Sequence, residues 1–238
     1  MILRGDGKSN LKNKDFLNQN PAKLQSEIMA TVGMINPPYS MAKRTKDKEQ
    51  YEINFISRML DSLVTGGRGI AIVPQSTVTG KTKTEKEIKR DILKKHTLEG
   101  VITLNKETFY NVGVNAVIVV FKAGIPHHKD HKCKFIDFSD DGYEVAKHIG
   151  LIETPEAKDR KELLLNVWNN EVKAPNEFCV ETTITPDDEW LHSFYYFNEI
   201  PPTDKEFEET VSDYLAFQLD MVLHGRDYLF KGDNDEEW

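Results

Sequence analysis

The stretch Gly33-Met34-Ile35-Asn36-Pro37-Pro38-Tyr39 marks the point where an apolar segment of the chain ends abruptly. The residues that lead into it, 28–35, form a short apolar run of the kind that makes a buried strand. Two consecutive prolines cannot continue a strand, because each lacks an N–H group and has a fixed φ angle. Asn36 is held extended by the proline after it. The sequence therefore predicts a strand whose carboxyl end presents an amide, a rigid turn and an aromatic ring.

In open α/β sheets, the carboxyl end of a strand is where ligands bind. The Asn36 amide can pair with a base-like amine, a proline carbonyl can accept a hydrogen bond from that amine, and the Tyr39 ring can stack on a flat ligand. Asn-Pro-Pro-Tyr also fits a plain strand terminator that carries no chemistry. The surrounding sequence has to separate these two interpretations.

Helical and strand-like patterns alternate after this turn. Apolar residues at helical spacing predict helices over 51–63 and over the basic segment 81–96, and apolar runs predict strands at 69–73, 98–104, 114–121 and 134–138. A short strand over 11–17 is expected before the turn. Such alternation is typical of an α/β fold with a mainly parallel sheet.

The C-terminal part of the chain has a different character. It predicts a helix at 162–168, an edge strand at 178–184, a capped helix start at 186–190 and an amphipathic helix at 207–228. Residues 176–238 hold three Lys or Arg against seventeen Asp or Glu, whereas residues 43–95 hold thirteen against seven. The acidic end is not expected to lie on DNA. It could meet a basic protein partner, or it could simply be solvated.

The rest of the composition narrows the class of protein. The chain of 238 residues has a net charge of -8, which argues against a simple DNA-coating protein. No apolar stretch reaches the roughly 18 residues of a membrane span, and the N-terminus has no signal-peptide pattern. Two distant cysteines, Cys133 and Cys179, suit a reducing cytoplasm. His127, His128 and His131 precede Cys133, but the spacing is a poor match to a zinc site, so no metal is expected.

Several motifs then occur in an order that resembles one enzyme family. Asn-Pro-Pro-Tyr is similar to the motif of methyltransferases that modify a conjugated nitrogen. The run from Gly33 to Gly124 continues with Val73-Pro74-Gln75-Ser76, a basic helix and Phe109-Tyr110-Asn111-Val112-Gly113. This order resembles the modification subunits of type I restriction-modification systems, which are DNA adenine-N6 methyltransferases.

The resemblance implies a Rossmann-like sheet that uses S-adenosylmethionine (SAM). The glycine-rich loop that holds the methionine part of SAM in that family has no counterpart before Asp15. The chain therefore resembles the C-terminal half of such a sheet. We expect a partial catalytic domain over residues 1–140 and a smaller mixed or helical region, with a subunit contact, over residues 141–238.

The resemblance also assigns roles to residues. It implies a catalytic motif, a pair of aromatic residues that pack on the target base, a contact with the adenine ring of SAM and a basic segment near the DNA backbone. The implied catalytic motif is Asn36, Pro37, Pro38 and Tyr39, and the Tyr39 ring would stack on one face of the base. Phe109 takes the place of the second base-packing aromatic residue, with Tyr110 as the neighbouring candidate. The implied SAM contacts are Asp15 and Phe16, and the implied DNA-backbone residues are Lys43, Arg44 and Lys46.

Expected partners are DNA, the specificity subunit, the restriction subunit and the missing N-terminal half of the methyltransferase. The amphipathic helix at 207–228 fits contact with the specificity subunit by its position, although packing on Trp190, Phe194 and Phe197 of the same chain is an equal alternative. Two other functions stay open at this point: methylation of a glutamine amide in a protein, and an inactive fragment that serves assembly.

Overall fold

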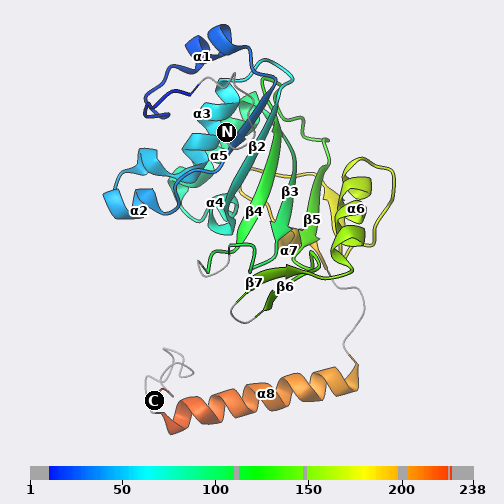
Figure 1. The fold of residues 1–238 in the computed structure, drawn as a ribbon. Helices are drawn as coiled ribbons and strands as arrows, with labels where there is room; N and C mark the ends of the chain where they lie inside the picture. The colour runs from blue at the N-terminus through cyan, green and yellow to red at the C-terminus, as the bar shows by residue number, and fades with distance from the viewer. Residues whose placement is uncertain (1–10, 110–112, 147–148, 198–202, 225, 227–238) are drawn as a thin grey trace. The chain divides into compact units, whose positions relative to one another are not determined.

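The computed structural model describes residues 11–109, 113–146, 149–197, 203–224 and 226 (Figure 1). The chain forms two compact units, residues 1–196 and residues 197–238. The first unit extends past residue 140, because the strand Cys179–Thr182 pairs with the strand Cys133–Phe138. Among the described helices, none combines the length and apolar character that a membrane crossing needs.

A six-stranded sheet forms the centre of the first unit (Figure 1). Its strands are β1 (Val32–Ile35), β2 (Arg68–Pro74), β4 (Ala116–Lys122), β3 (Thr97–Leu104), β5 (Cys133–Phe138) and β8 (Cys179–Thr182), in that spatial order. In this sheet β1, β2, β3 and β5 run in one direction, and β4 and β8 run against their neighbours. A separate hairpin pairs β6 (Tyr143–Ala146) with β7 (Gly150–Glu153). The expected α/β fold with a mainly parallel sheet is confirmed.

Helices pack on both faces of the sheet. The helices of the first unit are α1 (Pro21–Ile28), α2 (Met41–Thr45), α3 (Glu52–Asp61), α4 (Gln75–Thr79), α5 (Lys83–Lys95), α6 (Ala157–Trp168) and α7 (His192–Tyr195), with a short 3-10 turn η2 (Lys48–Gln50). The second unit holds α8 (Asp204–Leu223). Because side chains alternate along a strand, Val101 packs in the core with α3 and α5, while its neighbour Ile102 packs in the core with α6. Gly33 lets β1 approach α3 closely, since a Cβ there would lie 3.0 Å from Met59 Cγ.

The strand β1 forms one edge of the described sheet. It pairs with β2 only, and the side chains of Val32 and Met34 are 62% and 71% exposed. Ile28 and Met29, just before the strand, are 55% and 69% exposed. An apolar edge strand with open backbone groups is a template for further pairing. This edge is therefore where more sheet can be added.

Most predicted elements are confirmed, and two are wrong. The helices expected over 51–63 and 81–96 are α3 and α5, and the latter starts at Lys83 because Thr82 and Glu85 form a capping box before it. The strand expected over 11–17 is a turn, because the Asp15 carboxylate accepts a hydrogen bond from Leu17 N at 3.0 Å.

The helix start expected at 186–190 is also wrong. The Asp188 carboxylate accepts hydrogen bonds from the N and Oγ1 of Thr185, which closes a turn, and α7 begins at His192. The expected strand over 28–35 is shorter, since α1 runs to Ile28 and Met29 takes a left-handed conformation that ends it. In the second unit, α8 starts earlier than expected, at a capping box of Thr203 and Glu206, and the end of the predicted helix lies outside the described residues.

Candidate active site

The turn 36–39 follows directly on the carboxyl end of β1. The side chain of Asn36 is exposed, Pro37 is buried and Pro38 is exposed. The parallel neighbour β2 ends at Pro74, and it points its carboxyl end to the same edge. The sequence thus places an accessible amide at the sheet edge where α/β proteins bind ligands.

Tyr39 is held in place by two distant parts of the chain. Its hydroxyl donates to the backbone carbonyl of Ile72 in β2 at 3.3 Å. Its ring meets the ring of Phe109 edge to face, with centroids 6.2 Å apart and planes at 83°. Burial of the half-covered hydroxyl, together with the negative charge of Glu52, raises the pKa of Tyr39. The structure therefore brings together Tyr39 and Phe109, two of the three aromatic residues predicted for the site.

The loop that carries Phe109 starts where β3 ends. Asn105 begins it, and its amide donates to the Asp141 carboxylate at 2.9 Å and reaches the carbonyl of Tyr143 at 3.4 Å. These bonds tie the loop to the start of the β6–β7 hairpin. Phe109 itself is half-buried. Tyr110, the neighbouring candidate for this contact, lies outside the described residues.

The predicted DNA-backbone segment forms α2 and the residue after it. Arg44 is exposed, and its guanidinium donates to the carbonyl of Tyr39 at 3.2 Å. Lys46 is exposed and ends α2 in a left-handed conformation. Lys43 lies in the same helix. The basic segment is thus joined to the Asn36–Tyr39 turn by a hydrogen bond as well as by sequence.

Asp15 and Phe16, the predicted contacts to SAM, lie in the turn before α1. The Asp15 carboxylate accepts from Leu17 N at 3.0 Å and from the Asn18 amide at 2.8 Å. The ring of Phe16 is half-buried and packs against the core that contains α3. An aromatic ring and a carboxylate are therefore available at the N-terminal end of the described chain.

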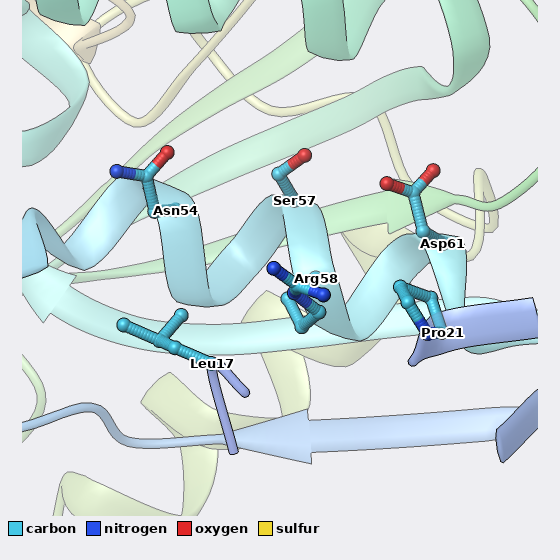
Figure 2. A pocket seen from close by; sticks show the side chains of 6 residues that line it. All are labelled: Leu17, Pro21, Asn54, Ser57, Arg58 and Asp61. Carbon is cyan, nitrogen blue, oxygen red and sulfur yellow. The ribbon is translucent and has the colours of Figure 1, made fainter. Parts of the chain in front are cut away.

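A cavity of about 390 Å³ lies beside these residues, between the N-terminal segment and α3. Figure 2 shows Leu17 and Pro21 opposite the α3 side chains Asn54, Ser57, Arg58 and Asp61. Arg58 donates to the carbonyl of Gln19 at 2.7 Å, which fastens the segment to the helix. Leu17, which lines the cavity, is the residue after Phe16. None of the predicted catalytic residues lines this cavity.

The histidine-rich loop shows ring packing instead of convergent ligands. His127 and His131 meet edge to face with centroids 5.3 Å apart. Burial, with repulsion from His131 and His128, lowers the pKa of His127 to about 4. Within the part of the chain that the structure describes, no group of three or more His, Cys, Asp or Glu side chains could hold a metal ion. Cys133 donates to the carbonyl of Leu98 at 3.0 Å, and burial raises its pKa to about 12.

One residue at the site was not singled out from the sequence. Glu52, in the first turn of α3, accepts a hydrogen bond from the backbone N–H of Ser40 at 2.6 Å. Ser40 follows Tyr39 and has a left-handed backbone with φ 60°. The only signal in the sequence was an acidic residue at a predicted helix start, which is a common pattern at any helix N-terminus.

Comparisons with known proteins address the family. The model of the family described as N-6 DNA Methylase matches residues 1–189. The chain is 47% identical over 241 residues to the type II restriction enzyme and methyltransferase RM.BcgI of Heyndrickxia coagulans; the alignment covers 100% of this chain and 37% of that protein. The chain thus spans little more than a third of the curated relative that it matches.

Solved structures share the fold at low sequence identity. A type I restriction-modification methyltransferase subunit from Streptococcus thermophilus matches with a TM-score of 0.55 and 18% identity, over 72% of this chain and 38% of that one. The M protein of the type I restriction enzyme EcoKI matches with a TM-score of 0.52 and 16% identity, over 89% of this chain and 52% of that one. The family model matches residues 1–189 of the 238 residues in this chain, so the chain belongs to the N-6 DNA methylase family.

Proposed function

We propose that this chain is the catalytic half of a site-specific DNA adenine-N6 methyltransferase in a restriction-modification system. The observation that carries the proposal is the joining of Asn36 and Tyr39, at the carboxyl end of β1, with Phe109 from the loop after β3. A flat base needs a polar group at its edge and an aromatic ring at its face, and this site offers both. The match to the N-6 DNA methylase family supports the same reaction class.

The chemistry asks little of the protein beyond positioning. The lone pair of adenine N6 is conjugated into the ring, so the enzyme must hold the amine and favour sp³ geometry. The Asn36 side-chain oxygen and the Pro37 carbonyl can accept hydrogen bonds from the two N–H groups. SAM would supply the methyl group from its sulfonium centre. Orientation of the two reactants then provides most of the rate.

The target base has to leave the duplex to reach such a site. Tyr39 and Phe109, with Tyr110 as the neighbouring candidate, would pack on its faces. Lys43, Arg44 and Lys46 would lie near the DNA backbone, where cationic side chains fix the position of the duplex. Because Arg44 donates to the Tyr39 carbonyl, a phosphate contact there would act directly on the turn that holds the base.

The binding site for SAM would be shared with another part of the methyltransferase. Phe16 and Asp15 fit the adenosine end of the cofactor, as an aromatic ring and a carboxylate do in nucleotide sites. Nothing before Asp15 in the sequence matches a glycine-rich loop for the methionine end. The exposed side chains of Val32 and Met34 on the open edge of β1 support an N-terminal half that adds strands there.

The second unit is proposed to bind the specificity subunit. Along α8 none of the residues is buried, and the exposed side chains include Phe207 at 62%, Leu215 at 56% and Leu219 at 61%. An amphipathic helix of 20 residues gains most of its stability by packing its apolar side chains on a partner. The alternative is packing on Trp190, Phe194 and Phe197 of the same chain. The Trp190 ring is already 1% exposed and meets Phe121, whereas Phe194 and Phe197 are 44% and 78% exposed, so this alternative stays open to experiment.

The separate specificity and restriction subunits of a type I system stay predictions. The sequence relative described above is a type II enzyme, whereas the two solved structures described above are type I proteins. Methylation of a protein glutamine is not favoured, since the family model that matches is a DNA methylase. The remaining alternative is an inactive module that serves assembly. Such a module would transfer no methyl group even after the N-terminal half has been supplied, whereas the proposed enzyme would.

Replacement of Asn36 by Ala tests the proposed function. In the completed methyltransferase, Asn36→Ala should abolish methyl transfer to adenine and leave the calorimetric affinity for SAM nearly unchanged, because Asn36 faces the target amine. Asn176→Ala, an exposed asparagine before β8, is the matched control and should retain full turnover. Near wild-type turnover in Asn36→Ala would show that the assignment is wrong.

A further inference from the structure

The turn that carries Asn36 is rigid at Pro37 and Pro38, but its conformation after Tyr39 depends on contacts with other parts of the chain. Pro37 and Pro38 have fixed φ angles, so the direction of the Asn36 amide is set by how the chain is held on both sides of them. On one side, β1 pairs with β2. On the other side, Ser40 takes a left-handed backbone with φ 60° and ψ 21°, which is unfavourable for a residue with a side chain. Something has to hold Ser40 in that conformation.

Glu52 makes the contact that does so. Its Oε1 accepts from Ser40 N at 2.6 Å, a short bond of the charge-assisted kind. Its side chain is half-buried and lines a cavity of about 230 Å³ together with Ser40 and Tyr51. The bond itself is exposed, so it is the charge of the carboxylate, and not the exclusion of water, that strengthens it.

Glu52 is the first residue of α3, and this helix is anchored in the main core. In α3 the residues Ile53, Ile56 and Leu60 are at most 3% exposed and belong to the main core. The same helix packs against β1 at Gly33, where a Cβ would lie 3.0 Å from Met59 Cγ. One helix therefore supports the strand before the turn and the residue after it. A carboxylate in the first turn of a helix is also favoured by the helix dipole.

We infer that Glu52 is a positioning residue for the Asn36–Tyr39 turn, an inference that rests on the proposed function. Glu52 fixes Ser40, and through Ser40 it fixes the carbonyl and the ring of Tyr39, which Arg44 and Phe109 contact from the other sides. The turn then meets the target base in one conformation. Loss of the carboxylate should loosen the turn and leave the rest of the sheet in place.

Three variants test this inference. Glu52→Ala removes the acceptor, and Glu52→Gln keeps an acceptor oxygen but loses the charge. Glu85→Ala is the matched control: Glu85 lines the same cavity and forms the capping box with Thr82, so its loss weakens α5 without touching Ser40. Thermal unfolding of the three variants compares their stabilities, so that a local effect at Ser40 can be told from a general loss of stability.

The first measurement is hydrogen exchange of the peptide that spans Tyr39 and Ser40, made on the 238-residue chain itself. Glu52→Ala should speed exchange of that peptide about tenfold to a hundredfold, which is the range for a lost hydrogen bond to a charged group. Glu85→Ala should leave it unchanged. Unchanged exchange in a folded Glu52→Ala variant would overturn the inference.

The second measurement is the titration of Tyr39, followed by the NMR signals of labelled tyrosine rings and assigned with Tyr39→Phe. Glu52→Gln should lower the pKa of Tyr39, because it removes a neighbouring negative charge. A titration that does not move would show that Glu52 is not held beside Tyr39, and would overturn the inference.

The third measurement is methyl transfer by the completed methyltransferase. Glu52→Ala should lower kcat about tenfold or more and leave the affinity for SAM unchanged, and Glu52→Gln should restore most of the rate. Faster exchange at Ser40 with an unchanged kcat would overturn the positioning role. Where even the unmodified protein transfers no methyl group to adenine, the proposed function fails, while exchange and titration still decide whether Glu52 holds the turn.

Discussion

Removal of either aromatic ring at the site tests whether Tyr39 and Phe109 together hold a flipped base. In the structure the rings meet edge to face at 6.2 Å, so the edge of one ring covers the face of the other. A base can pack between them only after this contact has opened. Binding therefore exchanges the ring pair, worth about 0.5–1.5 kcal/mol, for stacking of about 1–3 kcal/mol on each ring.

This exchange fixes the expected magnitudes. A single Tyr39→Ala or Phe109→Ala change loses one stacking contact, but it also removes the need to open the ring pair. The net loss of base capture is then on the order of 1 kcal/mol, roughly fivefold. The double variant loses both stacking contacts. The cost of opening the ring pair is avoided once in the double variant, whereas it is subtracted twice when the two single losses are added. The loss in the double variant should exceed the product of the single losses by a factor of about two to ten, which is the ring-pair energy.

Fluorescence of 2-aminopurine at the target position, titrated with the completed methyltransferase, measures base capture. Tyr39→Phe is the control for the hydroxyl: it loses only the 3.3 Å hydrogen bond to the Ile72 carbonyl, so we expect less than a few-fold change. Phe194→Ala, an exposed ring elsewhere, should change nothing. Unchanged emission in both single variants, or losses that simply multiply in the double variant, would refute the reasoning.

Two further predictions concern stability and assembly. The Lys89 ammonium is fully buried, and burial lowers its pKa from 10.5 to about 8. The unfolded chain therefore binds more protons between pH 8 and 10.5, and this group should raise the free energy of unfolding across that window by up to about 3 kcal/mol. Urea unfolding at pH 7 and pH 10 should show this rise in the unmodified chain relative to Lys89→Met, and a pH-independent difference between the two would contradict it. Replacement of Leu215 and Leu219 by Asp should leave circular dichroism unchanged and abolish co-purification with the specificity subunit; unfolding of the isolated chain would instead place α8 in its own core.

The sequence determined the local parts of this protein. Two prolines after an apolar run end a strand wherever it lies, so the turn at the end of β1 could be placed without a structure. Apolar residues at helical spacing placed α3 and α5 in the same way, since this signal acts over a few residues. The Thr82–Glu85 capping box that starts α5 at Lys83 was recognised only in the structure. The presence of an amide at Asn36 and an aromatic ring at Tyr39 beside this turn was also evident from the sequence alone.

Local signals also account for the two predictions that were wrong. Asp15 and Asp188 look like residues that belong to a strand end or a helix cap. In the fold each carboxylate bonds instead to backbone N–H groups two or three residues away and closes a turn. Short polar side chains can satisfy either pattern, and the choice between them depends on where the chain must go next.

Only the tertiary structure decided which distant groups meet. Phe109 is 70 residues from Tyr39 in the chain, and their contact requires that β1 and β3 point their carboxyl ends to the same edge of the sheet. The bond from Ser40 to Glu52 likewise depends on how α3 packs back on β1. Pairing order and helix packing arise from the burial of many apolar side chains at once. For that reason no single motif encodes them, and the residues that hold the Asn36–Tyr39 turn could be recognised only in the folded chain.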